Sequence, residues 1–416
     1  MTNDSRPSSR TKNFSRRALL GGSASLAAVS ALPRTARATP SATAKPVLIQ
    51  VFLRFGMDGL TAVVPYGDDP LYNHRPALAI RPPGTTNGAI DLDGFFGLAP
   101  SATALLTPYN DGRLAIVHAA GSGDTTRSHF EAMDLMEIGD PSVPIGTLGT
   151  GWAARYLIET ATPTSADLRG IAVGVMPISL NQAPKTLPVR SFFFKFPGRS
   201  LTALQRTSAL QEAYALRPPI IAAPALDTFA SFAFGGIDFN GYVPENGAQY
   251  PNSEFGNRMR EIATLVKEEV GVEVICVDYD GWDLHADLGP IVGSMAFQLR
   301  DLTRALEAFY LDMSGRPDDY VLVCLSEFGR HVRENGSAGV DHGHGNAMFV
   351  MGNGVNGGQV IADWPGLSAG DLDNGDLATT IDYRDVLGEI LLGPLGLTDL
   401  SAIFPGHVFT PHGVLT

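Results

Sequence analysis

The sequence predicts an α/β protein with a mostly parallel central sheet, helices on both faces and a loop-rich insertion. Four short apolar runs, at 46–55, 114–119, 272–277 and 320–325, are continuous rather than alternating, as in strands that are buried on both faces. Stretches with a helical period, at 254–269 and 291–311, separate the later runs. Polar residues follow each run directly, which places them at the carboxyl ends of the strands, where open α/β sheets bind ligands.

Length and charge limit the function further. The chain has 416 residues and a formal net charge of −13, and 44% of its residues are hydrophobic. Without the first 38 residues it has 42 acidic and 23 basic residues, a net charge of −19. Nucleic acid is therefore not expected as a partner, because phosphate contacts need a basic face. A small anionic substrate held by a metal is compatible with this charge.

The amino terminus is predicted to be a cleaved twin-arginine signal over residues 1–38. A basic stretch ends in Ser15-Arg16-Arg17, an apolar run follows at 18–32, and Ala36-Arg37-Ala38 resembles a cleavage site. The alternative is a membrane anchor, but the run is shorter than the roughly 20 residues that span a bilayer. We therefore expect the twin-arginine machinery as a partner, a periplasmic or extracellular location, and no stable membrane span in the mature chain. A linker is expected at 39–45, followed by one domain at 46–416.

The first strand, at 46–55, ends in Gly56-Met57-Asp58-Gly59. Glycines on both sides of Asp58 let a ligand or a metal approach the backbone. An ordinary Asp-Gly turn explains the same residues. Residues 98–109 then predict a short helix before the second strand.

The second strand, at 114–119, is followed by Arg127 and Ser128. Ser128 with Glu131 forms a capping-box pattern, so a helix is expected to begin at Ser128. A hydroxyl at a helix amino terminus is also placed as a nucleophile or an anion ligand. Thr125 and Thr126 are alternative candidates for that role.

Residues 146–250 are predicted to be an insertion or cap on the substrate side. Helices are expected at 152–160 and 200–215, and strands at 170–175 and 191–196. Nothing in this stretch has the spacing of metal ligands.

The third and fourth strands are followed by the strongest ligand pattern. Asp283 and His285 lie two residues apart, so in extended backbone they point to the same side. Glu327 follows the fourth strand, and Asp341, His342 and His344 come shortly after it. Carboxylates and imidazoles together suit a divalent metal, whether Zn, Mn, Mg or Ca. A strand at 347–351 and a helix at 379–392 complete the pattern.

The two cysteines, Cys276 and Cys324, each lie within an apolar run. A disulfide would suit an oxidising compartment, but a bridge between adjacent central strands is geometrically awkward. Two buried free thiols are therefore expected.

Five motifs and the leader resemble the exported bacterial proteins known as domain of unknown function family 1501. The motifs are GMDGLTAVVPY (56–66), RSHFEAMD (127–134), GWDLH (281–285), SEFGR (326–330) and DHGHG (341–345). This family is similar in fold to the alkaline phosphatase and sulfatase superfamily, so the resemblance implies that fold and a metal-dependent hydrolase site.

The resemblance also implies roles for individual residues. Asp58 would be a metal ligand, Ser128 the nucleophile, and Asp283 with His285 the ligands of one metal. Glu327-Phe328 stands where the superfamily usually has an Asp-His pair, so His342 and His344 would supply the missing imidazole. No Cys-x-Pro-Ser-Arg sequence is present, so formylglycine chemistry is not expected.

These observations support the hypothesis of an exported hydrolase that acts on a small anionic phosphate or sulfate ester. One or two divalent ions would polarise the ester, Ser128 would attack it, and Arg330 or Arg127 would bind the anion's free oxygens. A second hypothesis is an exported metal-binding protein without activity, which binds or assembles a surface polymer or partner. A third is a purely structural α/β protein.

Overall fold

The computed structural model describes residues 45–140, 143–144, 147, 149–160, 168–190, 209–210, 212–218, 222, 237, 239 and 241–416. The predicted signal at 1–38 and most of the linker lie outside these residues. So do the strand predicted at 191–196 and most of the helix predicted at 200–215.

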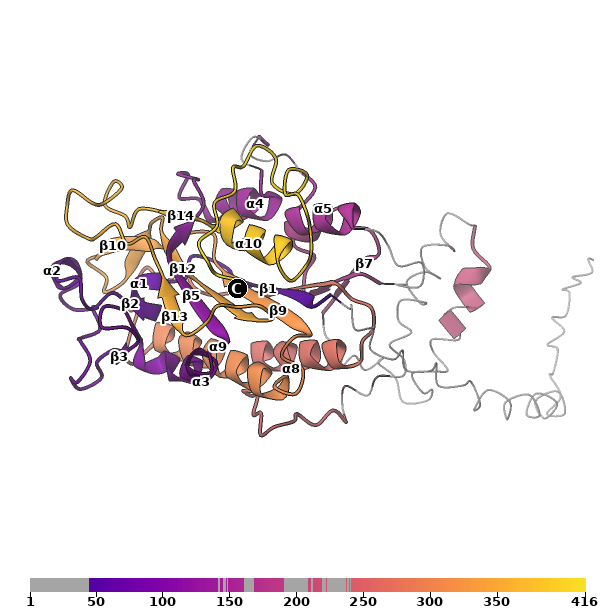
Figure 1. Ribbon diagram of the computed structural model, residues 1–416, viewed down its shortest axis with the longest axis horizontal. Helices are drawn as coiled ribbons and strands as arrows, with labels where there is room; N and C mark the ends of the chain where they lie inside the picture. Colours follow the sequence, from indigo (N-terminus) through magenta and orange to yellow (C-terminus); the bar gives the residue numbers. More distant parts are fainter. Residues whose placement is uncertain are drawn as a thin grey trace, which may run out of the picture. The chain divides into compact units, whose positions relative to one another are not determined.

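A nine-stranded sheet forms the centre of the domain (Figure 1). Its main path is β13 (Gln359–Ile361), β5 (Leu114–Gly121), β12 (Asn346–Gly352), β9 (Tyr320–Leu325), β1 (Val47–Leu53), β8 (Val274–Tyr279), β6 (Gly170–Val173) and β7 (Thr186–Val189). β14 (Ile381–Asp382) pairs with β5. In the described sheet only β12 is antiparallel to its neighbours. The four predicted strands, β1, β5, β8 and β9, run in one direction, so their carboxyl ends meet at one edge.

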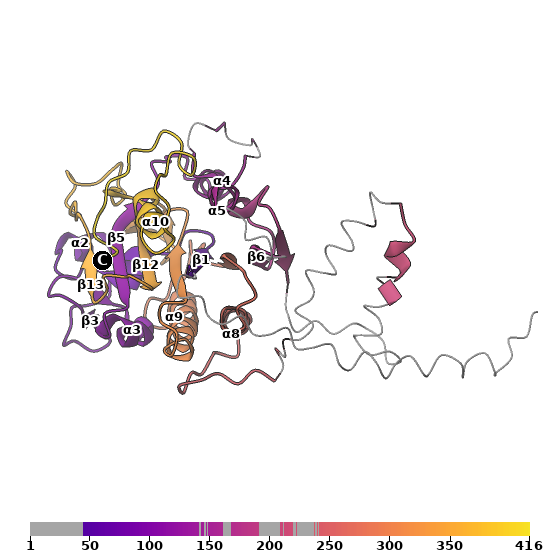
Figure 2. The ribbon, with the colours of Figure 1, turned by 45° about the vertical axis from the view of Figure 1, so that its right-hand side comes forward.

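Helices cover both faces of this sheet, as the sequence predicts. One layer holds α4 (His129–Ile138), α5 (Trp152–Glu159) and α10 (Tyr383–Leu392), and the other holds α3 (Leu106–Asn110), α8 (Glu254–Lys267) and α9 (Ser294–Asp312) (Figures 1 and 2). The fold is therefore a mixed α/β sandwich with a mostly parallel sheet.

Smaller elements lie in the connections. They are α1 (Gly59–Ala62), α2 (Pro70–His74), the 3-10 helices η2 (Pro100–Leu105) and η3 (Ile178–Leu180), the small sheet of β2 (Val63–Val64), β4 (Gly97–Leu98) and β3 (Ile90–Asp91), and the hairpin of β10 (Arg330–Glu334) and β11 (Val340–His342).

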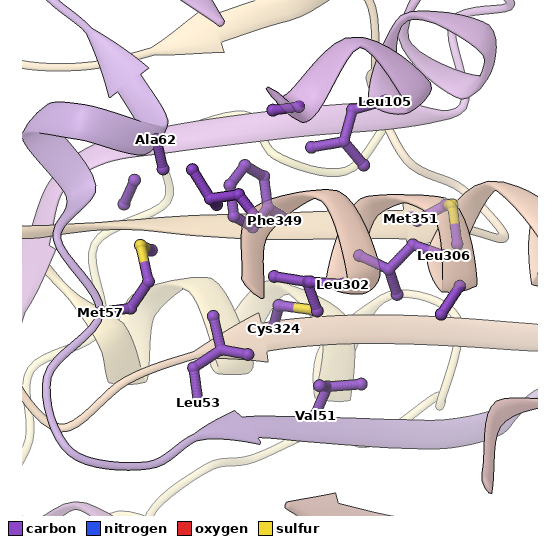
Figure 3. Packing of buried hydrophobic residues seen from close by; sticks show 14 of the residues in the cluster. Val51, Leu53, Met57, Ala62, Leu105, Leu302, Leu306, Cys324, Phe349 and Met351 are labelled. Carbon is purple, nitrogen blue, oxygen red and sulfur yellow. The ribbon is translucent and has the colours of Figure 1, made fainter. Parts of the chain in front are cut away.

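β1 shows why these strands read as continuous apolar runs. Its side chains alternate between the two faces, and both faces are buried beneath helices. Val51 and Leu53 pack toward α9, which contributes Leu302 and Leu306 to the same cluster (Figure 3). Phe52 points into the cluster of the opposite layer. The two cores hold the strand ends, and hence the loops that follow them, in fixed positions.

Several local predictions need correction. The helix predicted at 379–392 begins at Tyr383, because the Asp382 carboxylate accepts a hydrogen bond from the amide of Arg384 and caps it there. Residues 98–109 split into a short strand, a 3-10 turn and α3. The helix after β5 begins where predicted, but the side chain of Ser128 makes no capping hydrogen bond.

The cysteine prediction is confirmed. Cys276 and Cys324 are free and buried, and β1 lies between their strands. Burial raises the pKa of both thiols. Among the described residues, no helix has the length and apolar character needed to cross a membrane.

Candidate metal centre

Three loops at the carboxyl edge of the sheet bring imidazoles and carboxylates together. His129 is the first residue of α4, which follows β5. Asp283 and His285 lie in the loop after β8, and His342 ends β11 of the hairpin that follows β9. Strands that are distant in the chain thus deliver these side chains to one place.

A single carboxylate oxygen, Oδ1 of Asp283, is the centre of the cluster. The Nε2 atoms of His129, His285 and His342 lie 3.1, 3.0 and 3.3 Å from it. The Nε2 atoms of His285 and His342 are 2.9 Å apart. The ligand atoms of His129, Asp283 and His342 all lie within 4.8 Å of one another.

The other nitrogen of each imidazole is occupied by a protein acceptor. The Nδ1 contacts are His129 to Glu327 Oε1 at 2.6 Å, His285 to Asp341 Oδ1 at 2.9 Å, and His342 to the Arg127 carbonyl at 2.7 Å. A carboxylate or carbonyl can only accept, so each Nδ1 carries the proton. Each ring therefore directs its Nε2 atom toward Asp283.

Nitrogen and oxygen atoms that lie this close together need either a proton or a cation between them. Nε2 of His129 is buried and has no hydrogen-bond partner among the described residues, although it lies 3.1 Å from the carboxylate. Ligand atoms around a tetrahedral zinc ion are roughly 3.3 Å apart, because each bond is about 2.0 Å long. The observed separations and the mixed nitrogen and oxygen donors thus fit a divalent ion such as Zn²⁺.

The pKa values favour the protonation states that ligands need. Burial alone would raise the pKa of Asp283, but the hydrogen bond and charge of Arg330 lower it to about 2. Burial, assisted by the nearby charges of His129 and Arg330, lowers the pKa of His342. At neutral pH Asp283 is therefore a carboxylate and His342 is a neutral imidazole.

The structure thus brings Asp283, His285 and His342 together, as the sequence indicated. The backbone between the first two is bent rather than extended, since the His285 amide donates to the Asp283 carbonyl at 3.2 Å. His129 was not predicted as a ligand from the sequence. A histidine one residue inside a helix that follows a parallel strand is a signal that could have identified it.

Glu327 and Asp341 were predicted as metal ligands, but each contacts an imidazole of the cluster on the side away from Asp283. Glu327 is fully buried at the end of β9, and its contacts are to His129 and to the hydroxyl of Ser326. Asp341 contacts His285 and accepts a hydrogen bond from Asn335. In these positions both carboxylates orient imidazoles.

Asp58 occupies a different environment from the one predicted. Its carboxylate accepts two hydrogen bonds from Arg75, at 2.6 and 3.1 Å, and one from the hydroxyl of Thr61 at 2.5 Å. It is buried, and its backbone carbonyl begins α1. The Arg75 guanidinium neutralises this carboxylate, so its charge is already matched within the protein.

Arg330 is buried and contacts the cluster through Asp283. Its buried guanidinium donates to the carbonyls of Phe55 and Gly56, both at 2.6 Å, and to Asp283 Oδ1 at 2.8 Å. It therefore joins the loops after β1 and β8 and fixes the central carboxylate. With its donors used in this way, it faces the protein and not a substrate.

His344 and Arg127 form a neighbouring polar group. Nδ1 of His344 lies 2.9 Å from Asp373 Oδ2, and its buried Nε2 has no partner in the described part of the chain. Arg127, which has a φ of 53°, pairs with the buried Asp376. Burial raises the pKa of Asp376, and the charge of Arg127 opposes that shift.

Ser128, the predicted nucleophile, is the N-cap residue of α4 and is bonded directly to His129 in the chain. Its amide donates to the Thr126 hydroxyl at 3.3 Å, whereas its own hydroxyl makes no hydrogen bond within the described residues. The hydroxyl is therefore available at the positive end of a helix, beside the imidazole cluster.

Comparisons with known proteins give distant structural matches and one family match. Similar solved structures include Ps i-CgsB in complex with k-i-k-neocarrahexaose (9% identity, 87% of this chain and 75% of that chain, TM-score 0.41) and the C-terminal periplasmic domain of EcEptC from Escherichia coli in complex with Zn (10%, 74% and 73%, 0.29). Another is alkaline phosphatase from the Antarctic bacterium TAB5 (9%, 75% and 93%, 0.29). No curated protein matches the sequence. The family resemblance seen in the motifs is confirmed: residues 206–399, which include Asp283, His285, Glu327 and His342, match the family described as "Protein of unknown function (DUF1501)".

Proposed function

We propose that this chain is an exported, metal-dependent hydrolase of phosphate or sulfate esters. One observation carries the proposal: three imidazoles, each with its Nδ1 proton committed to an acceptor, direct Nε2 toward one carboxylate oxygen. Such an arrangement suits a divalent cation, because it gathers imidazole nitrogens around a carboxylate oxygen. The proposed ligands are His129, Asp283, His285 and His342.

The bound ion would act as a Lewis acid on an ester oxygen. The protein's own part is to hold the ligands before the substrate arrives. Glu327 and Asp341 fix the rings of His129 and His285, and Arg330 fixes the carboxylate of Asp283. This orientation by outer partners keeps the site rigid and excludes the wrong tautomers.

Ser128 is the proposed nucleophile. Its hydroxyl is not used to cap α4, and it lies at the helix amino terminus next to His129. The helix dipole favours negative charge at this position, so it stabilises the anion of the ester and the developing charge on the hydroxyl. Attack by its oxygen on phosphorus or sulfur would release the alcohol and leave a serine ester for water to hydrolyse.

Arg127 is the proposed contact for the anion, since it precedes Ser128 in the chain. Its ion pair with Asp376 holds the guanidinium in place, and its side chain remains partly exposed. Asp58 and His344 are left out of the ion's ligand set, because Asp58 pairs with Arg75 and His344 contacts Asp373 and not the cluster.

Export rests on the amino-terminal sequence. The paired arginines, the apolar run and the Ala-Arg-Ala sequence support a twin-arginine signal over residues 1–38. This pathway would place the mature domain in the periplasm or outside the cell.

A second candidate function is metal-dependent binding without hydrolysis, in the assembly of a surface polymer or partner. The commitment of Arg330 to the protein interior and the pairing of Arg127 with Asp376 favour it, because neither arginine is unpaired. An anion would then have to displace Asp376 from Arg127.

Metal content and an ester panel distinguish the two functions. We expect the purified protein to bind about one zinc or manganese ion per chain and to hydrolyse 4-nitrophenyl phosphate or sulfate. His129→Ala should lose both the ion and turnover, and Ser128→Ala should keep the ion and lose turnover. The half-buried Glu131→Gln, on the same helical turn, is the matched control and should keep both. Bound metal without turnover on any ester would favour the binding function, and absence of metal would exclude both.

A further inference from the structure

Two aromatic residues, Phe55 and Phe130, lie between the candidate metal centre and solvent. His129 and Phe130 are adjacent at the start of α4, and helical geometry turns their side chains about 100° apart. His129 is buried in the cluster, whereas the Phe130 side chain is 72% exposed. An exposed phenylalanine beside a buried ligand places a large apolar face at the edge of the site.

Phe55 joins these two residues. Its ring is edge-on to His129, with ring centroids 5.4 Å apart, and edge-on to Phe130, at 6.5 Å. No other ring contact of Phe130 is found among the described residues. The ring of Phe55 thus supports Phe130 from behind and leaves the outer face of Phe130 in water.

The backbone at Phe55 is strained to keep this arrangement. Phe55 has a φ of 77°, a left-handed conformation that is costly for a bulky aromatic residue, and Gly56 continues it with a φ of 66°. Arg330 donates to the carbonyls of both residues at 2.6 Å and so holds the strained turn. The same guanidinium donates to Asp283, so Arg330 holds both the Phe55 turn and the central carboxylate of the metal centre in place.

We propose that Phe55 and Phe130 form a platform for the alcohol part of the ester, and that this part is a ring with a flat apolar face. An exposed aromatic face packs well against an aryl ring or against the C–H face of a sugar, and poorly against a short alkyl chain. We place the leaving alcohol here, because Phe130 follows the proposed nucleophile and ligand, Ser128 and His129, at the start of α4. The inference rests on the proposed hydrolase site and adds the class of substrate.

Kinetics on three esters of the active acid, phosphate or sulfate, test the platform. The esters are those of 4-nitrophenol, of a hexose and of methanol. We expect Phe130→Leu, which is apolar but not flat, to raise KM about tenfold for the two ring esters, with kcat and the methyl ester unchanged. Phe130→Tyr, which restores a flat face, should restore KM. Val408→Ala removes an equally exposed apolar side chain from the carboxyl-terminal tail and should change nothing. The ring ester with the larger effect identifies an aryl or a sugar substrate.

A binding measurement separates this inference from the proposed hydrolysis. Saturation-transfer NMR with 4-nitrophenol and with a methyl hexoside should show contact in the wild type and its loss in Phe130→Leu, even if no ester is turned over. Equal effects of Phe130→Leu on the ring and methyl esters, an effect on kcat alone, or unchanged NMR contacts would each overturn the platform. So would concentration-dependent association of the wild type that Phe130→Leu abolishes, because it would assign this face to a second copy of the chain.

Discussion

At the scale of single residues, the centre depends on partners that are not ligands themselves. Glu327 follows β9 in the position where the sequence suggests a ligand, yet its short contact, 2.6 Å, is to Nδ1 of His129. The imidazole lies between the carboxylate and the ligand cluster. Phe328 stacks on the same ring, with centroids 4.7 Å apart, so this residue also confines His129. In the proposed centre, the Glu-Phe pair thus positions His129.

Replacement of Glu327 tests this distinction. Glu327→Gln keeps an oxygen that accepts the proton of His129 Nδ1 but removes the charge that makes Nε2 more basic. We expect zinc to bind with unchanged stoichiometry and about 10–100-fold lower affinity, measured by competition with a chromophoric chelator. Glu137→Gln is the matched control, since Glu137 is equally buried but pairs with Arg54 at the far end of α4, and it should leave zinc affinity unchanged. Complete loss of zinc in a folded Glu327→Gln protein would make Glu327 a ligand after all.

At the scale of elements, two predictions concern the residues at which helices begin. Ser253 caps α8, because its hydroxyl accepts a hydrogen bond from the amide of Gly256 at 3.0 Å. Ser128 holds the same place on α4 and makes no such bond. A helix that leaves its N-cap hydroxyl unused keeps that hydroxyl free for chemistry.

The two serines therefore respond differently to replacement. Ser253→Ala should lower the free energy of unfolding by about 1 kcal/mol, because it removes a cap. Ser128→Ala should change the free energy of unfolding by less than about 0.5 kcal/mol. Both are measured by chemical denaturation of metal-free protein, so that ligand binding does not contribute. A loss of about 1 kcal/mol in Ser128→Ala would show that the hydroxyl caps α4 in solution.

Local elements could be predicted from the sequence, but their assembly could not. Strands 320–325 and 47–53 appear almost as predicted, because their apolar periodicity is local information. The insertion of the antiparallel β12 between β5 and β9, and the β10–β11 hairpin that carries His342, depend on pairing between distant segments. Asp58 likewise pairs with Arg75 in the fold, and no motif around Asp58 predicts this contact. The motifs therefore predicted the residue types of the candidate site. His129 and the partners of the imidazoles could be identified only from the fold.

At the scale of the whole molecule, hydrogen bonds hold the carboxyl-terminal tail against α10. Glu389 accepts hydrogen bonds from the amides of His412, Gly413 and Leu415, at 2.6, 3.0 and 3.0 Å. One turn earlier on the helix, Asp385 accepts from Nε2 of His407 and from the amide of Thr410. The tail then pairs with the segment after β12, where the Asn356 amide donates to the carbonyl of Val414. Two buried carboxylates thus connect the last residues to α10, and a backbone hydrogen bond connects them to the loop after β12.

Glu389→Gln tests how much this closure stabilises the domain. The amide that replaces one carboxylate oxygen cannot accept a hydrogen bond, so at least one part-buried backbone N–H loses its partner. We expect the free energy of unfolding to fall by about 1–3 kcal/mol and the amides of residues 412–415 to exchange faster with deuterium. Asp399→Asn, at an exposed turn of the same tail region, should change the free energy by less than about 0.5 kcal/mol. Zinc affinity should stay the same in both variants, because the ligands lie in the loops after β5, β8 and β9. Unchanged exchange at 412–415 would mean that the tail is held by its apolar contacts and not by Glu389.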